Sequence, residues 1–187
     1  KSYYNRKHFV LAYTNRADTF NTIAQKLSFY EQDFSQKTKL AKTANDDFRK
    51  IMILNNVISN EYDIKKLYRS LQGIDYNKSQ KFDDFYSQIV KTKITLFGLK
   101  QKNPVSVFSS GEYSEQIKSI ISEILTENGF IISKNADYKI TSNSSFNFSE
   151  QVISKNIIYS CHPILSFLIE GKNGTISSCV LKSEKIS

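Results

Sequence analysis

Residues 9–34 combine a short apolar segment with a long run of helical periodicity. Apolar side chains recur at three- and four-residue spacing, which places them on one helical face: Phe20, Ile23, Ala24, Leu27, Tyr30 and Phe34. Asn15 or Thr14 can cap this helix, because a short polar side chain accepts a free backbone amide. The preceding segment His8–Tyr13 is typical of a strand, so we expect a sheet to cover the apolar stripe.

The chain from there to Gln72 contains no Gly or Pro, so helix can persist or restart. The apolar run at 51–58 fits a buried helix or a strand, because periodicity does not separate the two in so short a run. Residues 61–71 predict a helix that Gly73 ends. Two strands are expected next, at 73–77 and, from its two-residue alternation, at 84–97.

The polar segment 98–104, which ends in proline, predicts a boundary between domains at residues 1–98 and 104–187. The pattern after it predicts the order β-α-β-β-β-β: a strand at 105–108, a helix at 114–128, strands at 130–133 and 138–142, and a hairpin of 157–170 with 175–181 around a Gly-containing turn. Residues 143–149 are expected to form a surface loop. The predicted fold class is α+β, with two small domains, each a mostly antiparallel sheet packed against one or two helices.

Composition and charge narrow the possible environment of the chain. Its 187 residues are 40% hydrophobic, which is enough for a core, and no apolar run approaches the ~18 residues that span a bilayer. Because the chain begins at Lys1 and not at a methionine, we expect a trimmed or processed product, and any signal peptide or lipid-bearing cysteine would lie upstream.

The net charge of +8 is unevenly distributed along the chain. The first 102 residues contain 19 Lys and Arg against 10 Asp and Glu, and the remainder contain 7 against 8. A basic half can meet an anionic partner, and Lys37, Lys39 and Lys42 are the candidate partner-binding basic face. Only four of the 26 basic residues are Arg, the better residue for reading phosphates and bases, so a solvated surface is favoured over a nucleic-acid interface.

The sequence offers little catalytic chemistry. It contains none of the common nucleotide-binding, serine-hydrolase or zinc-protease motifs. Cys161 and His162 are adjacent, but neighbours in a strand point to opposite faces and cannot form a dyad there. We therefore predict no catalytic, cofactor-binding or metal-binding residues and no cofactor. The enzyme alternative requires a pocket that holds His8 or His162 near a carboxylate.

The two cysteines are predicted to be free and buried. In the expected hairpin, position 168 lies opposite Cys179, and Cys161 lies about seven residues further along. At ~3.3 Å per residue the separation is near 23 Å, far beyond the span of a disulfide.

The order of these segments resembles known envelope proteins. The strand His8–Tyr13, the periodic helix after it, LQGIDY (71–76) and FYSQIVKTKI (85–94) resemble lipoprotein-20-type envelope lipoproteins and the amino-terminal domain of the flagellar assembly protein FlgT. PVSVF, IKSIISEILTENGF, ADYKI and the closing hairpin resemble the middle part of FlgT, the TolB amino-terminal domain and lipoprotein activators of cell-wall synthases. The first-strand glycine common in the lipoprotein family is missing.

The resemblance implies a non-enzymatic protein of the bacterial periplasm or outer membrane that works by protein contact. We expect an interaction or assembly module for a flagellar or cell-wall complex, with a protein partner and attachment to the membrane through an upstream lipid anchor. The alternative is a nucleic-acid-binding protein that uses the basic first half, and salt-dependent binding to DNA or RNA distinguishes it.

Overall fold

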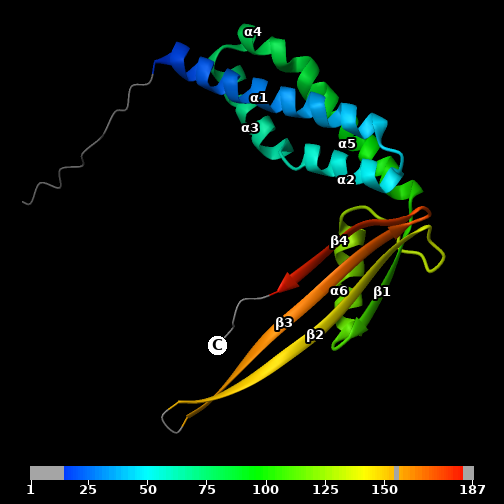
Figure 1. The fold of residues 1–187 in the computed structure, drawn as a ribbon. Helices are drawn as coiled ribbons and strands as arrows, with labels where there is room; N and C mark the ends of the chain where they lie inside the picture. Colours follow the sequence, from blue (N-terminus) through cyan, green and yellow to red (C-terminus); the bar gives the residue numbers. More distant parts are fainter. Residues whose placement is uncertain (1–14, 154–155, 183–187) are drawn as a thin grey trace, which may run out of the picture.

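The computed structural model describes residues 15–153 and 156–182, with side chains for 15–150 and 160–182. Helices form the first half: α1 (Arg16–Thr43), α2 (Asp47–Ile58), α3 (Glu61–Ile74), α4 (Tyr76–Ser79), the 3-10 turn η1 (Gln80–Phe82) and α5 (Asp83–Lys102). The helix α1 lies along both α2 and α3, and α5 completes an elongated bundle (Figure 1). None of the described helices is long and apolar enough to cross a membrane. The expected strand His8–Tyr13 and the side chain of His8 lie outside the described residues.

The organising helix is confirmed. Asn15 is the N-cap of α1, and its side chain accepts a hydrogen bond from the amide of Ala17 at 2.9 Å. The apolar stripe shares one core with residues of α2, α3 and α5, and Leu27 is fully buried. The main bundle core is formed by residues that recur with helical period: Phe20, Ala24, Leu27, Phe34, Val57, Ile64, Leu71, Phe82, Phe85 and Ile89. The stripe is therefore covered by helices and not by a sheet.

The strands expected at 73–77 and 84–97 are wrong, because the first segment spans the end of α3 and the start of α4 on either side of Asp75, and the second is helical. The helix α3 continues through Gly73 to Ile74, and 84–97 lies within α5. The apolar residues of α5 satisfied a two-residue alternation by coincidence, whereas its buried residues Phe85, Ile89 and Leu96 follow the helical period. The ambiguous run at 51–58 is helical as well, as part of α2.

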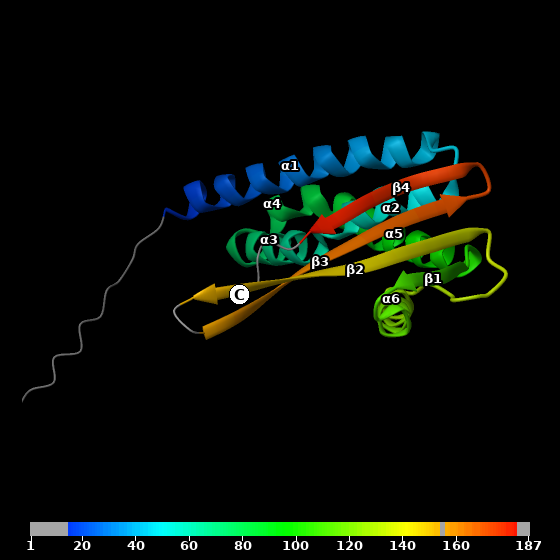
Figure 2. The same cartoon turned by 60° about the horizontal axis from the view of Figure 1, so that its bottom comes forward.

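A four-stranded sheet forms the second half. It comprises β1 (Val105–Gly111), β2 (Tyr138–Ile153), β3 (Asn156–Gly171) and β4 (Gly174–Lys182), with α6 (Ser114–Glu127) between β1 and β2. The strands lie in the order β1-β2-β3-β4, with β1 parallel to β2 and the other pairs antiparallel. The helix α6 packs on β1 and β2 (Figure 2). The α+β class is confirmed.

Two details of the second half differ from expectation. Residues 143–149 belong to β2 and not to a loop, because each pairs with a residue of β3. The strand expected at 130–133 is reduced to one bridge between Ile132 and Val105. The closing hairpin is confirmed, and β2 and β3 continue past the ends of β1 and β4 as a two-stranded ribbon (Figure 1).

The two halves meet through buried aromatic rings. Phe48 of α2 is 4% exposed, and its ring centre lies 5.1 Å from that of Tyr138 and 5.9 Å from that of Phe130. The helix α5 reaches Lys102, so the segment expected to begin at Gly98 is helical up to that residue. The division into domains at 1–98 and 104–187 stays a prediction.

Lys100 adds a polar connection at the same junction. It is 6% exposed, and its ammonium donates to the side-chain oxygen of Asn55 and to the backbone oxygen of Asn128, each at 3.0 Å. Burial lowers the pKa of Lys100 below its usual value. One side chain thereby connects α5 to α2 and to the C-terminal end of α6.

The two cysteines are free, as predicted. Cys179 pairs with Phe167 in the sheet, one position from the expected partner, because Gly171 pairs with Gly174 and the hairpin therefore turns at Lys172-Asn173 and not at Asn173-Gly174. The register shift between Ile169 and Glu170 offsets part of this difference. The expectation that both thiols are buried is wrong: Cys161 is half-buried and Cys179 is exposed.

Candidate anion-binding pocket

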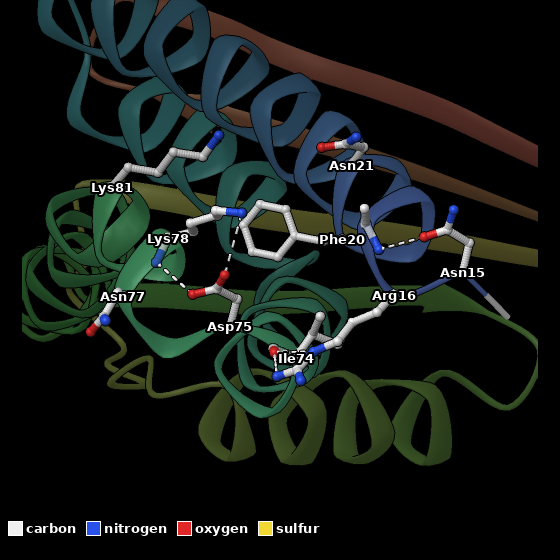
Figure 3. A pocket seen from close by; sticks show the side chains of 10 residues that line it. Asn15, Arg16, Phe20, Asn21, Ile74, Asp75, Asn77, Lys78 and Lys81 are labelled. Atoms are coloured by element: carbon white, nitrogen blue, oxygen red, sulfur yellow. Dashed lines mark hydrogen bonds and ion pairs between the residues drawn. The ribbon is translucent and has the colours of Figure 1, made fainter.

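An open pocket of about 840 Å³ lies where the start of α1 meets the end of α3 and the short helix α4 (Figure 3). Its lining brings together three basic side chains, one carboxylate, three amides and a phenyl ring: Arg16, Lys78, Lys81, Asp75, Asn15, Asn21, Asn77 and Phe20, with Ala17 and Ile74. The local sequence positions them, because Asn15 and Asp75 are the N-caps of α1 and α4.

Arg16 closes one side of the pocket. Its guanidinium donates through Nε to the backbone oxygen of Ile74 at 2.7 Å, and Nη2 donates to the same oxygen. That oxygen belongs to the last turn of α3, where helical carbonyls lack intrahelical partners. Arg16 therefore fixes the start of α1 against the end of α3 and keeps its charge at the pocket wall.

Asp75 is the acidic member of the pocket. Its side chain accepts the backbone amide of Lys78 at 3.1 Å, and its carboxylate lies 3.5 Å from the Lys78 ammonium. The pKa of Asp75 is lowered chiefly by that backbone hydrogen bond, with further contributions from the charges of Lys78 and Arg16. Asp75 therefore remains a carboxylate at neutral pH and acts as a cap, not as a proton donor.

Lys78 and Lys81 both lie near the ring of Phe20. Their ammonium groups are 5.9 Å and 6.0 Å from the ring centre, within the range of a cation–π contact. Phe20 is 7% exposed, so its ring supports the lysine stems from below. Both ammonium groups remain available to solvent above an apolar base.

The composition of the pocket suits binding of an anion. Arg16, Lys78 and Lys81 exceed the single carboxylate of Asp75 by two positive charges. Its lining contains no His, Cys or Ser that could act as a base or nucleophile. In the described part of the chain, no group of three or more His, Cys, Asp and Glu side chains could hold a metal ion.

The sequence-based candidates Lys37, Lys39 and Lys42 lie elsewhere, on the second half of α1. Lys37 pairs with Asp33 at 2.7 Å, whereas Lys39 and Lys42 are exposed. Their directions around the helix differ, by roughly 200° between Lys37 and Lys39. Lys42 borders a groove between α1, α2 and α5. Their role as a partner-binding face stays a prediction.

The sequence pattern indicated the basic half but missed this pocket. Arg16 and Lys78 are more than sixty residues apart, and only the antiparallel packing of α1 on α3 brings their segments together. Because 73–77 was expected to be a strand, its helix-start signal was not recognised. Asp75 is an N-cap residue, and Lys78 follows it three residues later.

His162 and Cys161 are separated as predicted. In the sheet Cys161 lies opposite Phe148 and His162 lies opposite Asn147, so their side chains point to different faces. They do not form a dyad.

Comparisons with known proteins give little further information. The sequence matches no protein-family model, and it matches no curated protein. Among solved structures, a minor lipoprotein from Acinetobacter baumannii is similar over 46% of this chain and 69% of that one, at 16% sequence identity and a TM-score of 0.33. This is a weak likeness of part of the fold to a lipoprotein.

Proposed function

We propose that this chain is a non-enzymatic interaction module that binds an acidic segment of a protein partner at the pocket of Figure 3. The observation that carries the proposal is the pairing of three basic side chains with one carboxylate around an open pocket. A peptide with two or more neighbouring carboxylates matches the surplus positive charge, and Phe20 provides an apolar base.

The three amides that line the pocket support a peptide ligand. Asn21 and Asn77 each carry a donor and an acceptor, which can bond to the backbone of an extended segment. Arg16 is held by Ile74, so one positive charge is positioned before a ligand arrives.

We place this activity in the bacterial envelope, on a protein held at the membrane by a lipid anchor. The support is the resemblance of the segment order of the second half, with its strand at 105–108, helix at 114–128 and closing hairpin, to the middle part of FlgT, the TolB amino-terminal domain and lipoprotein activators of cell-wall synthases. Assembly of a flagellar or cell-wall complex is the corresponding role. Fractionation of cells that express the full-length gene tests the location, and recovery in the cytosolic fraction contradicts it.

The binding proposal is tested by charge reversal in the pocket. We expect Lys78→Glu/Lys81→Glu to weaken binding of a fluorescent oligoglutamate peptide at least about tenfold, since two attractive charges become repulsive. The control, Lys118→Glu/Lys134→Glu, changes the net charge equally at exposed positions of the second half. Circular dichroism on every variant confirms that the fold is retained.

Equal losses in the two double variants would show a general charge effect and contradict the pocket. Binding of a single-stranded oligonucleotide in place of the peptide would favour the nucleic-acid alternative, and its salt dependence would count the phosphates contacted.

A further inference from the structure

A second basic surface lies on the α1–α3 side of the bundle and shares no residue with the pocket of Figure 3. It consists of two open hollows, of about 490 Å³ and 470 Å³, that have Lys66 and Ser70 in common. We call it the α1–α3 surface and define it by six residues: Lys26, Phe29, Tyr62, Lys65, Lys66 and Arg69.

Helical spacing aligns these residues. Tyr62, Lys65, Lys66 and Arg69 occupy positions i, i+3, i+4 and i+7 of α3, which is one face of that helix. Lys26 and Phe29 are three residues apart on α1, which packs beside α3. Four basic groups and two aromatic rings therefore share one side of the molecule.

The two aromatic rings are unusually open to solvent. Phe29 is 69% exposed and Tyr62 is 76% exposed, although each belongs to a well-packed helix. Single exposed apolar residues are common on protein surfaces and need no explanation. Two large rings among four basic side chains form a pattern that general solvation does not require.

The positive charges of this surface are not neutralised by the described ion pairs of neighbouring carboxylates. The described ion pairs on α1 and α3 join Lys37 to Asp33 and Lys93 to Glu61, and neither involves the four basic residues of the surface. Asp63 is the single acidic residue that lines the two hollows. The surface thus keeps a surplus of three positive charges.

We infer that the α1–α3 surface binds an anionic lipid bilayer, with Phe29 and Tyr62 at the level of the headgroups. Basic residues attract anionic lipids, and aromatic rings favour the boundary between water and hydrocarbon. Three of the four basic residues are Lys, which attracts anionic headgroups as a point charge, whereas bidentate reading of bases in nucleic acids favours Arg. This contact goes beyond the proposed function, because it orients the bundle on a membrane without using the pocket.

The absence of Trp from the sequence permits a direct test. In Phe29→Trp the new indole is the single tryptophan, and its emission should shift to the blue when vesicles of phosphatidylglycerol and phosphatidylcholine are added. Brominated lipids in the same vesicles should quench it. The matched control is Ile94→Trp on α5, because Ile94 is also 69% exposed.

Charge variants test the electrostatic part. Each basic residue near an anionic surface contributes about 1 kcal/mol, or about fivefold in partitioning. Lys66→Gln/Arg69→Gln should therefore weaken vesicle binding on the order of twentyfold, whereas Lys118→Gln/Lys134→Gln should weaken it less than about threefold. Vesicles of phosphatidylcholine alone should bind poorly.

Three outcomes would overturn the inference: equal blue shifts in the two tryptophan variants, no shift in either, or equal losses in the two charge pairs. Binding of a single-stranded oligonucleotide without binding of vesicles would assign the surface to nucleic acid instead. The Lys78→Glu/Lys81→Glu variant should lose the acidic peptide and retain the vesicles, so failure of the pocket and failure of this surface are distinguishable.

Discussion

Phe48 is the residue whose removal most directly tests how the two halves are held together. Its ring is 4% exposed and contacts Tyr138 and Phe130, so it belongs to the helical bundle by sequence and to the core of the sheet by packing. Phe48→Ala removes this ring and leaves a cavity between α2 and the start of β2. In the variant, the backbone amide of residue 48 can still donate to the side chain of Asp46, the N-cap of α2, so α2 itself should persist.

The expected cost is about 3–5 kcal/mol, the range for deletion of a buried phenyl ring. The upper part of that range is favoured, because two aromatic contacts of about 0.5–1.5 kcal/mol each are lost together. For a chain of this length, the melting temperature should fall by roughly 2–4 °C for each kcal/mol, measured at the transition. The matched control is Phe29→Ala, because Phe29 is 69% exposed and should change stability by less than about 0.5 kcal/mol.

The assay is urea denaturation of both variants and the wild type, followed by far-UV circular dichroism. Limited proteolysis of the same samples reports on the junction, and we expect cleavage between residues 98 and 106 to accelerate in Phe48→Ala. A loss below about 1 kcal/mol, or a loss equal to that of Phe29→Ala, would refute the reasoning that this ring joins the halves.

Three further predictions follow from the packing and the ionisation of single side chains. Leu27→Ala should cost about 2–5 kcal/mol in the same urea assay, because Leu27 is fully buried in the bundle core, and a cost below 1 kcal/mol would contradict that packing. The hydrogen bond from Tyr68 to Asp83 raises the pKa of Tyr68 to about 12, so its stabilisation is complete below pH 10 and is lost as the pH rises through 12. Tyr68→Phe should therefore be less stable than the wild type at neutral pH, and the difference should shrink under alkaline conditions. In the folded protein without reductant, Cys179 should react with a thiol reagent faster than Cys161, because Cys179 is more exposed; the reverse order would contradict this difference in exposure.

The periodicity of apolar residues located the first helix of the bundle more reliably than it located the strands. The stripe through Phe20, Leu27 and Phe34 has a single reading at helical spacing, and the structure buries all three. The apolar residues of 84–97 fit both the two-residue period of a strand and the period of a helix. Burial of Phe85 and Ile89 selects the helix, and this burial depends on α1 and α3, which the local pattern does not contain.

The second half was predicted well where short-range chemistry decides the conformation. The turn at Lys172-Asn173 is fixed by its neighbouring glycines, and Gly174 adopts a φ of 105°, which side chains rarely tolerate. The polar residues at 143–149 were mistaken for a loop, because most of their side chains are exposed and their pairing with β3 leaves no trace in the local pattern. The pocket was beyond prediction for a related reason, since Arg16 and Lys78 meet only through helix packing.

The two-stranded ribbon, in which residues 145–153 of β2 pair with 156–164 of β3, should have a local stability that differs from that of the rest of the sheet. Among the described residues, β2 pairs with β3 alone from Ser145 to Glu150, since β1 ends opposite Ser144 and the described part of β4 ends opposite Ile164. A two-stranded hairpin is marginal in water, so opening here costs far less than global unfolding. Amide hydrogens of this stretch should exchange with solvent while those of Tyr138–Ser144 stay protected, which makes the ribbon a separate cooperative unit of the native protein.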